Sequence, residues 1–176
     1  MTRTPTADKR AHTQERSQSV RVTRVRFAPG ERRAWVMFAP LVRQYVETLQ
    51  GRHPWPPTPR ALIAQATRPE VSVFIAERDG SAVGFAMAEP REGGTGRAAM
   101  WIEHLYCPRD LGAARALVAE IEAVAARRGC EWMAFETAAP DMRRRAALAG
   151  FRPVATVYGR EVWNGRSVRQ QEEAER

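Results

Sequence analysis

A turn between a predicted strand and a predicted helix is the stretch of this sequence best suited to bind an anion. An apolar run at residues 98–107 predicts the strand, and the helix begins within residues 109–114, which read Arg-Asp-Leu-Gly-Ala-Ala. The first backbone N–H groups of a helix have no partner inside it, and the helix dipole favours negative charge there. We therefore expect the amides of residues 111–115 to bind a phosphate group, with Arg109 or Arg115 adding a charged contact. An ordinary tight turn is the alternative.

Two glutamates stand in otherwise apolar strands and could accept a proton. Glu136 ends the apolar run at residues 130–136, and Glu103 lies in the run at residues 98–107, with His104 expected on the opposite face of that strand. Burial disfavours the charged form of a carboxyl group, so we expect a raised pKa that suits a general base. The alternative is that each glutamate pairs with one of the chain's many arginines.

The two strands that carry these glutamates are joined by a helix, which predicts a parallel pair with a right-handed crossover. Apolar residues recur at helical spacing between Ala114 and Ala125, and the helix is expected to stop at Gly129 after two arginines. The anion-binding turn would therefore lie at the end of the sheet where the first strand stops.

The remaining elements extend this crossover into a larger sheet. The apolar patterns predict, in chain order, a strand at 20–27, a helix at 31–50 that Pro40 kinks or divides, a short helix at 59–66, a hairpin of strands 71–78 and 82–89, and, after the crossover, a helix from 140 or 141 to 149 and a strand at 154–163. This order predicts an α/β (α+β) fold with a mixed, mainly antiparallel sheet, a central parallel βαβ crossover and helices on both faces. Residues 20–163 would form one domain between a disordered tail at 1–19 and a flexible tail at 164–176.

Composition excludes several classes of protein. The chain has 176 residues, 44% of them hydrophobic, with no apolar run of membrane-spanning length and a polar start, so we expect a cytoplasmic protein without membrane contact. Cys107 and Cys130 are too few for a disulfide scaffold, and metal ligands are missing near them. The net charge of +8 comes almost wholly from arginine, but no aromatic residues interleave with a basic motif, so nucleic acid is an unlikely partner. A homodimer could cover the sheet edge left by the last strand.

The turn and its surroundings resemble the GNAT-type N-acetyltransferases. The family's acyl-CoA signature, Arg/Gln-x-x-Gly-x-Gly/Ala between a strand and a helix, is matched by residues 109–114, and Gly150-Phe151 resembles the end of a later family helix. The resemblance covers residues 20–163 in element order and implies the acyl-CoA N-acyltransferase fold. It also implies transfer of an acetyl group from acetyl-CoA, as co-substrate and without a metal, to an amine of a small molecule or protein by direct attack on the thioester.

The resemblance assigns roles to individual residues. Glu136 matches a glutamate that serves as the base in some members, and Glu103 is the second candidate. The backbone of Leu105 and Cys107 would pair with the pantetheine arm and polarise the thioester carbonyl. The residues implied in binding CoA are Leu105, Cys107, Arg109, Asp110, Leu111, Gly112, Ala113, Ala114 and Arg115.

Two positions depart from the family pattern. Ala146 stands where a tyrosine commonly protonates the departing thiolate, and Ala139 and Pro140 replace a common asparagine. A CoA thiolate leaves without much help, because its pKa is near ~8.5 like that of a cysteine. These departures nevertheless motivate an alternative function, a non-catalytic acyl-CoA-binding or scaffold protein on the same fold.

Overall fold

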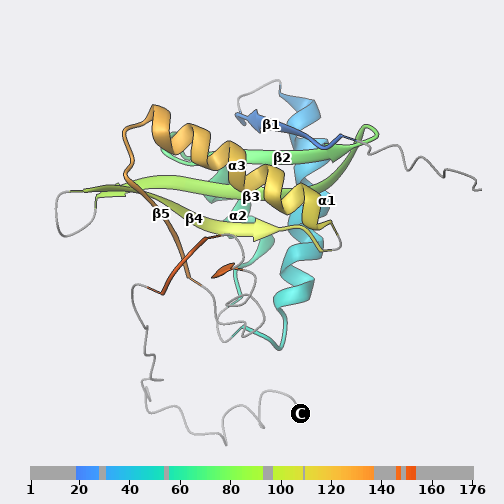
Figure 1. Ribbon diagram of the computed structural model, residues 1–176. Helices are drawn as coiled ribbons and strands as arrows, with labels where there is room; N and C mark the ends of the chain where they lie inside the picture. The colour runs from blue at the N-terminus through green and yellow to red at the C-terminus, as the bar shows by residue number, and fades with distance from the viewer. Residues whose placement is uncertain are drawn as a thin grey trace, which may run out of the picture. The chain divides into compact units, whose positions relative to one another are not determined.

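The computed structural model describes residues 19–27, 31–53, 56–92, 97–108, 110–136, 146–147 and 150–153. The chain divides into two compact units, Met1–Pro140 and Asp141–Arg176. The first unit holds a mixed sheet of five strands with helices on both faces, which confirms the predicted fold class (Figure 1). The predicted boundaries of a single domain stay a prediction.

The strands lie in the sheet in the same order as in the sequence. They are β1 (Arg21–Val25), β2 (Ser72–Arg78), β3 (Ser81–Glu92), β4 (Ala98–Tyr106) and β5 (Trp132–Phe135). Neighbouring strands from β1 to β4 are antiparallel, and β4 and β5 are parallel. Helix α3 (Leu111–Arg127) connects the parallel pair, so the predicted crossover is confirmed.

The hairpin between β2 and β3 forms at the predicted turn. Asp79 and Gly80 have positive φ angles of 53° and 76°, which a two-residue turn of type I′ requires. Glycine adopts this backbone without strain and aspartate tolerates it. Strand β3 runs on to Glu92, three residues beyond the predicted end.

Helices α1 (Arg32–Leu49) and α2 (Pro59–Ala66) cover one face of the sheet, where Phe38 is fully buried. Helix α1 is continuous through Pro40, so the division that we allowed for at this proline does not occur. Proline cannot donate to the carbonyl four residues earlier, here that of Val36. Val36 is 64% exposed, and water can therefore take the missing hydrogen bond.

Helix α3 covers the opposite face, and the residues it buries are all apolar (Figure 1). Ala113, Leu117 and Ile121 are fully buried, opposite the buried strand residues Phe74 and Met100. The apolar spacing predicted between Ala114 and Ala125 marks the side of the helix that faces the sheet, although Ala114 is only half-buried and the buried stripe begins at Ala113. The helix is thereby fixed along its length, including the first turn, where the anion-binding turn was predicted.

The helix predicted to end at residue 149 and the strand predicted at 154–163 fall largely outside the described residues. Within the described part, residues 146–147 are helical, and the Phe151 N–H donates to the Ala146 carbonyl at 3.0 Å. Gly150 has a φ of 83°, as expected of a glycine that ends a helix. No helix of the described residues is both long and apolar enough to cross a membrane.

Candidate functional site

Strand β4 contains a bulge at Glu103. His104 pairs with Met87 of β3 and Ile102 pairs with Ala88, which leaves Glu103 as an extra residue between them. A bulge breaks the alternation of side chains, so the two residues point to the same face. Glu103 forms an ion pair with Arg91 of β3, and His104 is bonded to residues of α1 and α2. The expectation that Glu103 and His104 point to opposite faces is therefore wrong.

Strands β4 and β5 separate just beyond this point. Their pairing ends at Ile102 and Phe135, whereas β4 continues to Tyr106. No described strand pairs with β4 beyond Ile102 on that side, which is where an extended ligand would add to the sheet. Glu136 directly follows β5, and its charge is one cause of the raised pKa of Glu103. The structure thus brings the two candidate bases together where the strands diverge.

The surroundings of the two glutamates differ from the expectation. Glu136 lies after the end of β5 and is exposed, so the burial that we predicted for its carboxyl group is wrong. Glu103 retains only 17% exposure of its side chain. Burial raises the pKa of the Glu103 carboxyl, the charges of Glu89 and Glu136 add to this, and Arg91 opposes it. Desolvation therefore acts on Glu103, the candidate ranked second from the sequence.

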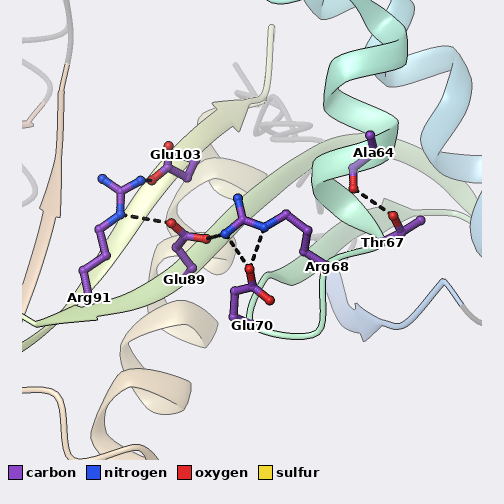
Figure 2. A network of polar contacts seen from close by, with 7 residues as sticks. All are labelled: Ala64, Thr67, Arg68, Glu70, Glu89, Arg91 and Glu103. Carbon is purple, nitrogen blue, oxygen red and sulfur yellow. Dashed lines mark hydrogen bonds and ion pairs between the residues drawn. The ribbon is translucent and has the colours of Figure 1, made fainter.

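Figure 2 shows the network of ion pairs that surrounds Glu103. Arg91 bridges Glu103 and Glu89, with its Nε 3.0 Å from Glu89 Oε1. Arg68 bridges Glu89 and Glu70, at 3.2 Å from Glu89 Oε2 and 2.6 Å from Glu70 Oε1. Pairing with arginine, the alternative considered for the glutamates, thus holds for Glu103.

The network is unevenly solvated and has more acidic than basic groups. The side chain of Glu89 is only 9% exposed. Its Oε2, like Oε1 of Glu103, is buried without a hydrogen bond from the described residues, although each atom lies in an ion pair. Three carboxylates share two guanidinium groups, and Glu136 adds a further negative charge. The carboxylates in excess, Glu70 and Glu136, are exposed, whereas the buried Glu89 and Glu103 are paired with arginine. The negative charge of the whole group favours a cation, such as a protonated amine, at this position.

A half-buried chain of polar side chains holds the bulge against the helices. His104 Nδ1 lies 3.2 Å from the Tyr45 hydroxyl of α1, and its Nε2 lies 3.2 Å from Gln65 Oε1 of α2. The amide oxygen can only accept, so Nε2 carries the proton and Nδ1 accepts from Tyr45. Burial lowers the pKa of His104 to about 4 and raises that of Tyr45 to about 12. Both groups are therefore neutral at neutral pH and serve to fix the bulge.

The first turn of α3 is capped by Asp110. Its Oδ1 accepts a hydrogen bond from the Ala113 N–H at 2.9 Å, and its backbone carbonyl accepts from the Ala114 N–H at 3.0 Å. Arg78 of β2 holds the same carboxylate through both oxygens, at 2.8 and 3.0 Å. Two of the amides predicted to bind phosphate are thus engaged by Asp110.

The other residues predicted to contact phosphate in this turn are Leu111, Gly112, Arg115 and Arg109. Leu111, Gly112 and Arg115 are exposed at the start of α3, whereas Arg109 lies outside the described residues. The hydrogen bonds from Arg78 and Ala113 lower the pKa of the Asp110 carboxyl, so this group is charged at neutral pH. Whether the exposed residues contact phosphate stays a prediction.

The end of β4 lies unusually close to β3. A Cβ atom on Gly84 would lie 2.2 Å from Cys107 Sγ and 2.7 Å from the Tyr106 carbonyl oxygen. Only glycine permits this approach, because the Tyr106 carbonyl belongs to the backbone and cannot be avoided without moving the strand. Leu105 pairs with Ala86, and burial raises the pKa of Cys107 to about 12. Cys107 is therefore a neutral thiol, and its expected contribution is through its backbone.

Several residues of the site were missed from the sequence. Glu89 ends the apolar run of β3, so the reasoning that singled out Glu136 would have identified it. Arg68 and Arg91 lie two residues from their partners Glu70 and Glu89, but they also pair with the distant Glu89 and Glu103. Arg78 pairs with Asp110, 32 positions away, so no local pattern distinguishes it among so many arginines. No group of three or more His, Cys, Asp or Glu in the described ranges could hold a metal ion.

Comparison with known proteins places the chain in a family. The model of the acetyltransferase (GNAT) family matches residues 38–151, well over half of the chain. A comparison with curated proteins gives no match.

The fold also resembles solved structures. The ribosomal-protein-alanine N-acetyltransferase of Brucella melitensis biovar Abortus 2308 is 20% identical, with a TM-score of 0.63 over 82% of this chain and 100% of that one. The aminoglycoside N-acetyltransferase AAC(6')-Iy in complex with CoA is 22% identical, with a TM-score of 0.64 over 84% of this chain and 97% of that one. At these identities the likeness shows a shared fold.

Proposed function

The chain belongs to the acetyltransferase (GNAT) family and is an acyltransferase, and we propose that it transfers an acetyl group from acetyl-CoA to an amine of a small molecule. The observation that carries this proposal is the position of Glu103, a desolvated carboxylate on a bulge beside the open edge of β4. A base and an extended binding edge for the thioester are the two parts that direct acyl transfer requires.

The described residues fit acetyl-CoA. The pairing of β5 with β4 ends at Ile102, and the pantetheine arm could add hydrogen bonds to β4 beyond that residue as a further strand would. Gly112 has no side chain at the start of α3, so a diphosphate could approach the backbone there. AAC(6')-Iy, a protein of similar fold, binds CoA, which supports acetyl-CoA as the co-substrate.

The carboxylates of the site would prepare the acceptor amine. An alkyl amine is mostly protonated at neutral pH, so it arrives as a cation and is attracted by Glu89, Glu103 and Glu136. Glu103 then accepts the proton, and the free nitrogen attacks the thioester carbon. The new C–N bond forms and the C–S bond breaks. The nitrogen loses a second proton as it becomes an amide, the departing thiolate gains one through solvent, and Glu103 returns its own proton to solvent. We thus place Glu103 before Glu136 as the base, because burial raises the pKa of Glu103 toward that of a useful base.

The acceptor that we propose is a small molecule with more than one amine. The carboxylates outnumber the arginines in the network around Glu103, so a second ammonium group would gain a partner there. Several solved structures of similar fold are of aminoglycoside acetyltransferases, among them AAC(6')-Iy and meta-AAC0020, which supports an acceptor of this kind.

The test is turnover on a panel of amines. Acetyl-CoA is supplied with aminoglycosides, linear diamines, monoamines and peptides with a free N-terminus. The release of the CoA thiol is recorded, and the acetylated products are identified by mass spectrometry. We expect acetylation of polyamines in preference to monoamines, and no product from the matched alcohols. Binding of acetyl-CoA without turnover on any amine would contradict the proposal and favour the non-catalytic alternative. Failure to bind acetyl-CoA would contradict both.

A further inference from the structure

An ion pair occupies the start of α3. Arg78, the last residue of β2, reaches across to Asp110 with its Nε at 2.8 Å from Oδ2 and its Nη2 at 3.0 Å from Oδ1. Asp110 Oδ1 also accepts from the Ala113 N–H at 2.9 Å. The carboxylate is therefore held by a guanidinium fork and a helix amide together, and these are the donors that bind phosphate groups in proteins.

The same two side chains fill the space that Gly112 leaves open. A Cβ atom on Gly112 would lie 3.2 Å from Asp110 Oδ1 and 3.4 Å from Arg78 Nη2. Gly112 is one of the residues that the family resemblance implies in binding CoA, within the stretch of amides expected to bind phosphate. In the structure an internal anion and its arginine lie beside that place.

We propose that Arg78 is a diphosphate-binding residue for CoA and that the Asp110 carboxylate occupies the anion position when no CoA is bound. This inference rests on the proposed function. When CoA binds, its diphosphate takes over the bonds from Arg78 and the start of α3, and the Asp110 carboxylate turns away into solvent. No covalent bond changes, and the exchange replaces one anion by another on the same donors.

The proposed exchange predicts the direction in which the affinity for CoA changes when Asp110 is replaced. A carboxylate and a phosphate present similar oxygen pairs to a guanidinium fork, so either can hold Arg78 in the same orientation. Asp110 must give up these bonds, and its charge remains near the incoming diphosphate. The loss of these bonds and the repulsion between Asp110 and the diphosphate both weaken the binding of CoA. Asp110→Asn should remove most of each effect and so increase the affinity for CoA. Asparagine is as good an N-cap as aspartate, so this variant keeps the helix start.

Asp79 provides a matched control. It lies next to Arg78 in the β2–β3 turn, where its charge also acts on the guanidinium, but it does not cap α3. Asparagine tolerates the positive φ of this position. Asp79→Asn therefore removes the same charge from the neighbourhood of Arg78 without freeing the start of the helix.

The experiment is calorimetric titration of the whole chain and its variants with CoA, 3′-dephospho-CoA and pantetheine. We expect Asp110→Asn to bind CoA on the order of tenfold more tightly than the parent chain, and Asp79→Asn to bind it equally. The gain should persist with 3′-dephospho-CoA, which keeps the diphosphate, and vanish with pantetheine, which has no phosphate. Arg78→Gln should bind CoA on the order of tenfold more weakly than the parent chain does. The affinity of Arg78→Lys should lie between that of the parent chain and that of Arg78→Gln.

Three results would overturn the inference while leaving the proposed function intact. They are CoA binding by Asp110→Asn no tighter than by the parent chain, a gain that Asp79→Asn reproduces, or a gain that is lost with 3′-dephospho-CoA. Helical circular dichroism of each variant checks that α3 is intact. A parent chain that binds no CoA at all would overturn the proposed function together with the inference.

Discussion

The two faces of the sheet differ in what they bury. The residues that α3 buries against the sheet are all apolar, with Leu117 and Ile121 packed opposite strand residues such as Phe74, and Ser72 is the buried polar residue on this face among the described residues. Under α1 and α2 an apolar core around Phe38 gives way, near the bulge of β4, to charged and polar groups. The apolar face therefore holds the crossover in place, and the other face carries the chemistry that we propose.

The polar groups are concentrated where pairing is incomplete. Along β4 the residues up to Ile102 pair on both sides, whereas those beyond it pair only with β3. The bulge at Glu103 stands at this boundary. The bulge turns the Glu103 side chain to the face where it pairs with Arg91. The difference between the two faces indicates that the position of the site is set by the residue at which the pairing of β4 with β5 ends.

The largest effect should come from the apolar face. Ile121→Ala removes a fully buried side chain from α3 and should lower the free energy of unfolding by about 2–5 kcal/mol, measured by urea titration. Val36→Ala, on the exposed side of α1, should change it by less than about 0.5 kcal/mol. In conditions where it is folded, Ile121→Ala should keep its turnover per molecule. A stable but inactive variant would contradict the separation of the two faces.

The next largest effect concerns His104 and pH. Its pKa is about 4 in the folded protein and near 6.5 when unfolded, so acid favours the unfolded chain. The stability that depends on neutral His104 is complete above pH 6.5 and is lost as the pH falls toward 4, by on the order of 3 kcal/mol.

Urea titrations at several pH values test this linkage. The stability gap between the parent chain and His104→Asn should narrow as the pH falls from 6.5 to 4. Tyr45→Phe keeps the imidazole and should retain the acid-dependent loss of the parent. A gap that is constant over this range would show that His104 is not held neutral by the helices.

A smaller effect is expected where β4 approaches β3. Gly84→Ala places a Cβ atom against Cys107 Sγ and the Tyr106 carbonyl, so the end of β4 must move. Overpacking of this kind should cost about 1–3 kcal/mol of stability in thermal or urea unfolding. Adding Cys107→Ala relieves only the sulfur contact and should restore part of the loss. A Gly84→Ala variant as stable as the parent chain would contradict the close approach of β4 to Gly84.

The sequence predicted the parts of the molecule that depend on local signals. The helix from Leu111 to Arg127 and its crossover follow from apolar spacing and a capping turn within one stretch of chain. The β2–β3 hairpin follows from Asp79-Gly80. In these cases the residues that specify the structure are neighbours in sequence.

The parts that were wrong or missed depend on distant residues. The bulge at Glu103 is a mismatch of register between β3 and β4, which no pattern within β4 contains. The exposure of Glu136 follows from where β5 ends, and the pairing of Arg78 with Asp110 joins residues 32 positions apart. An arginine-rich sequence leaves such pairings open, because every carboxylate has several candidates.

The central claim is that the bulged face is the active one and that Glu103 is its base. The most direct measurement is the pH dependence of kcat/KM for acetyl transfer by the parent chain, Glu103→Gln and Glu136→Gln. We predict that Glu103→Gln lowers kcat/KM by about 10²–10⁴-fold and removes the ascending limb, which in the parent lies above the pKa of an ordinary glutamate. Glu136→Gln should keep that limb. An unchanged rate and limb in Glu103→Gln would contradict the account.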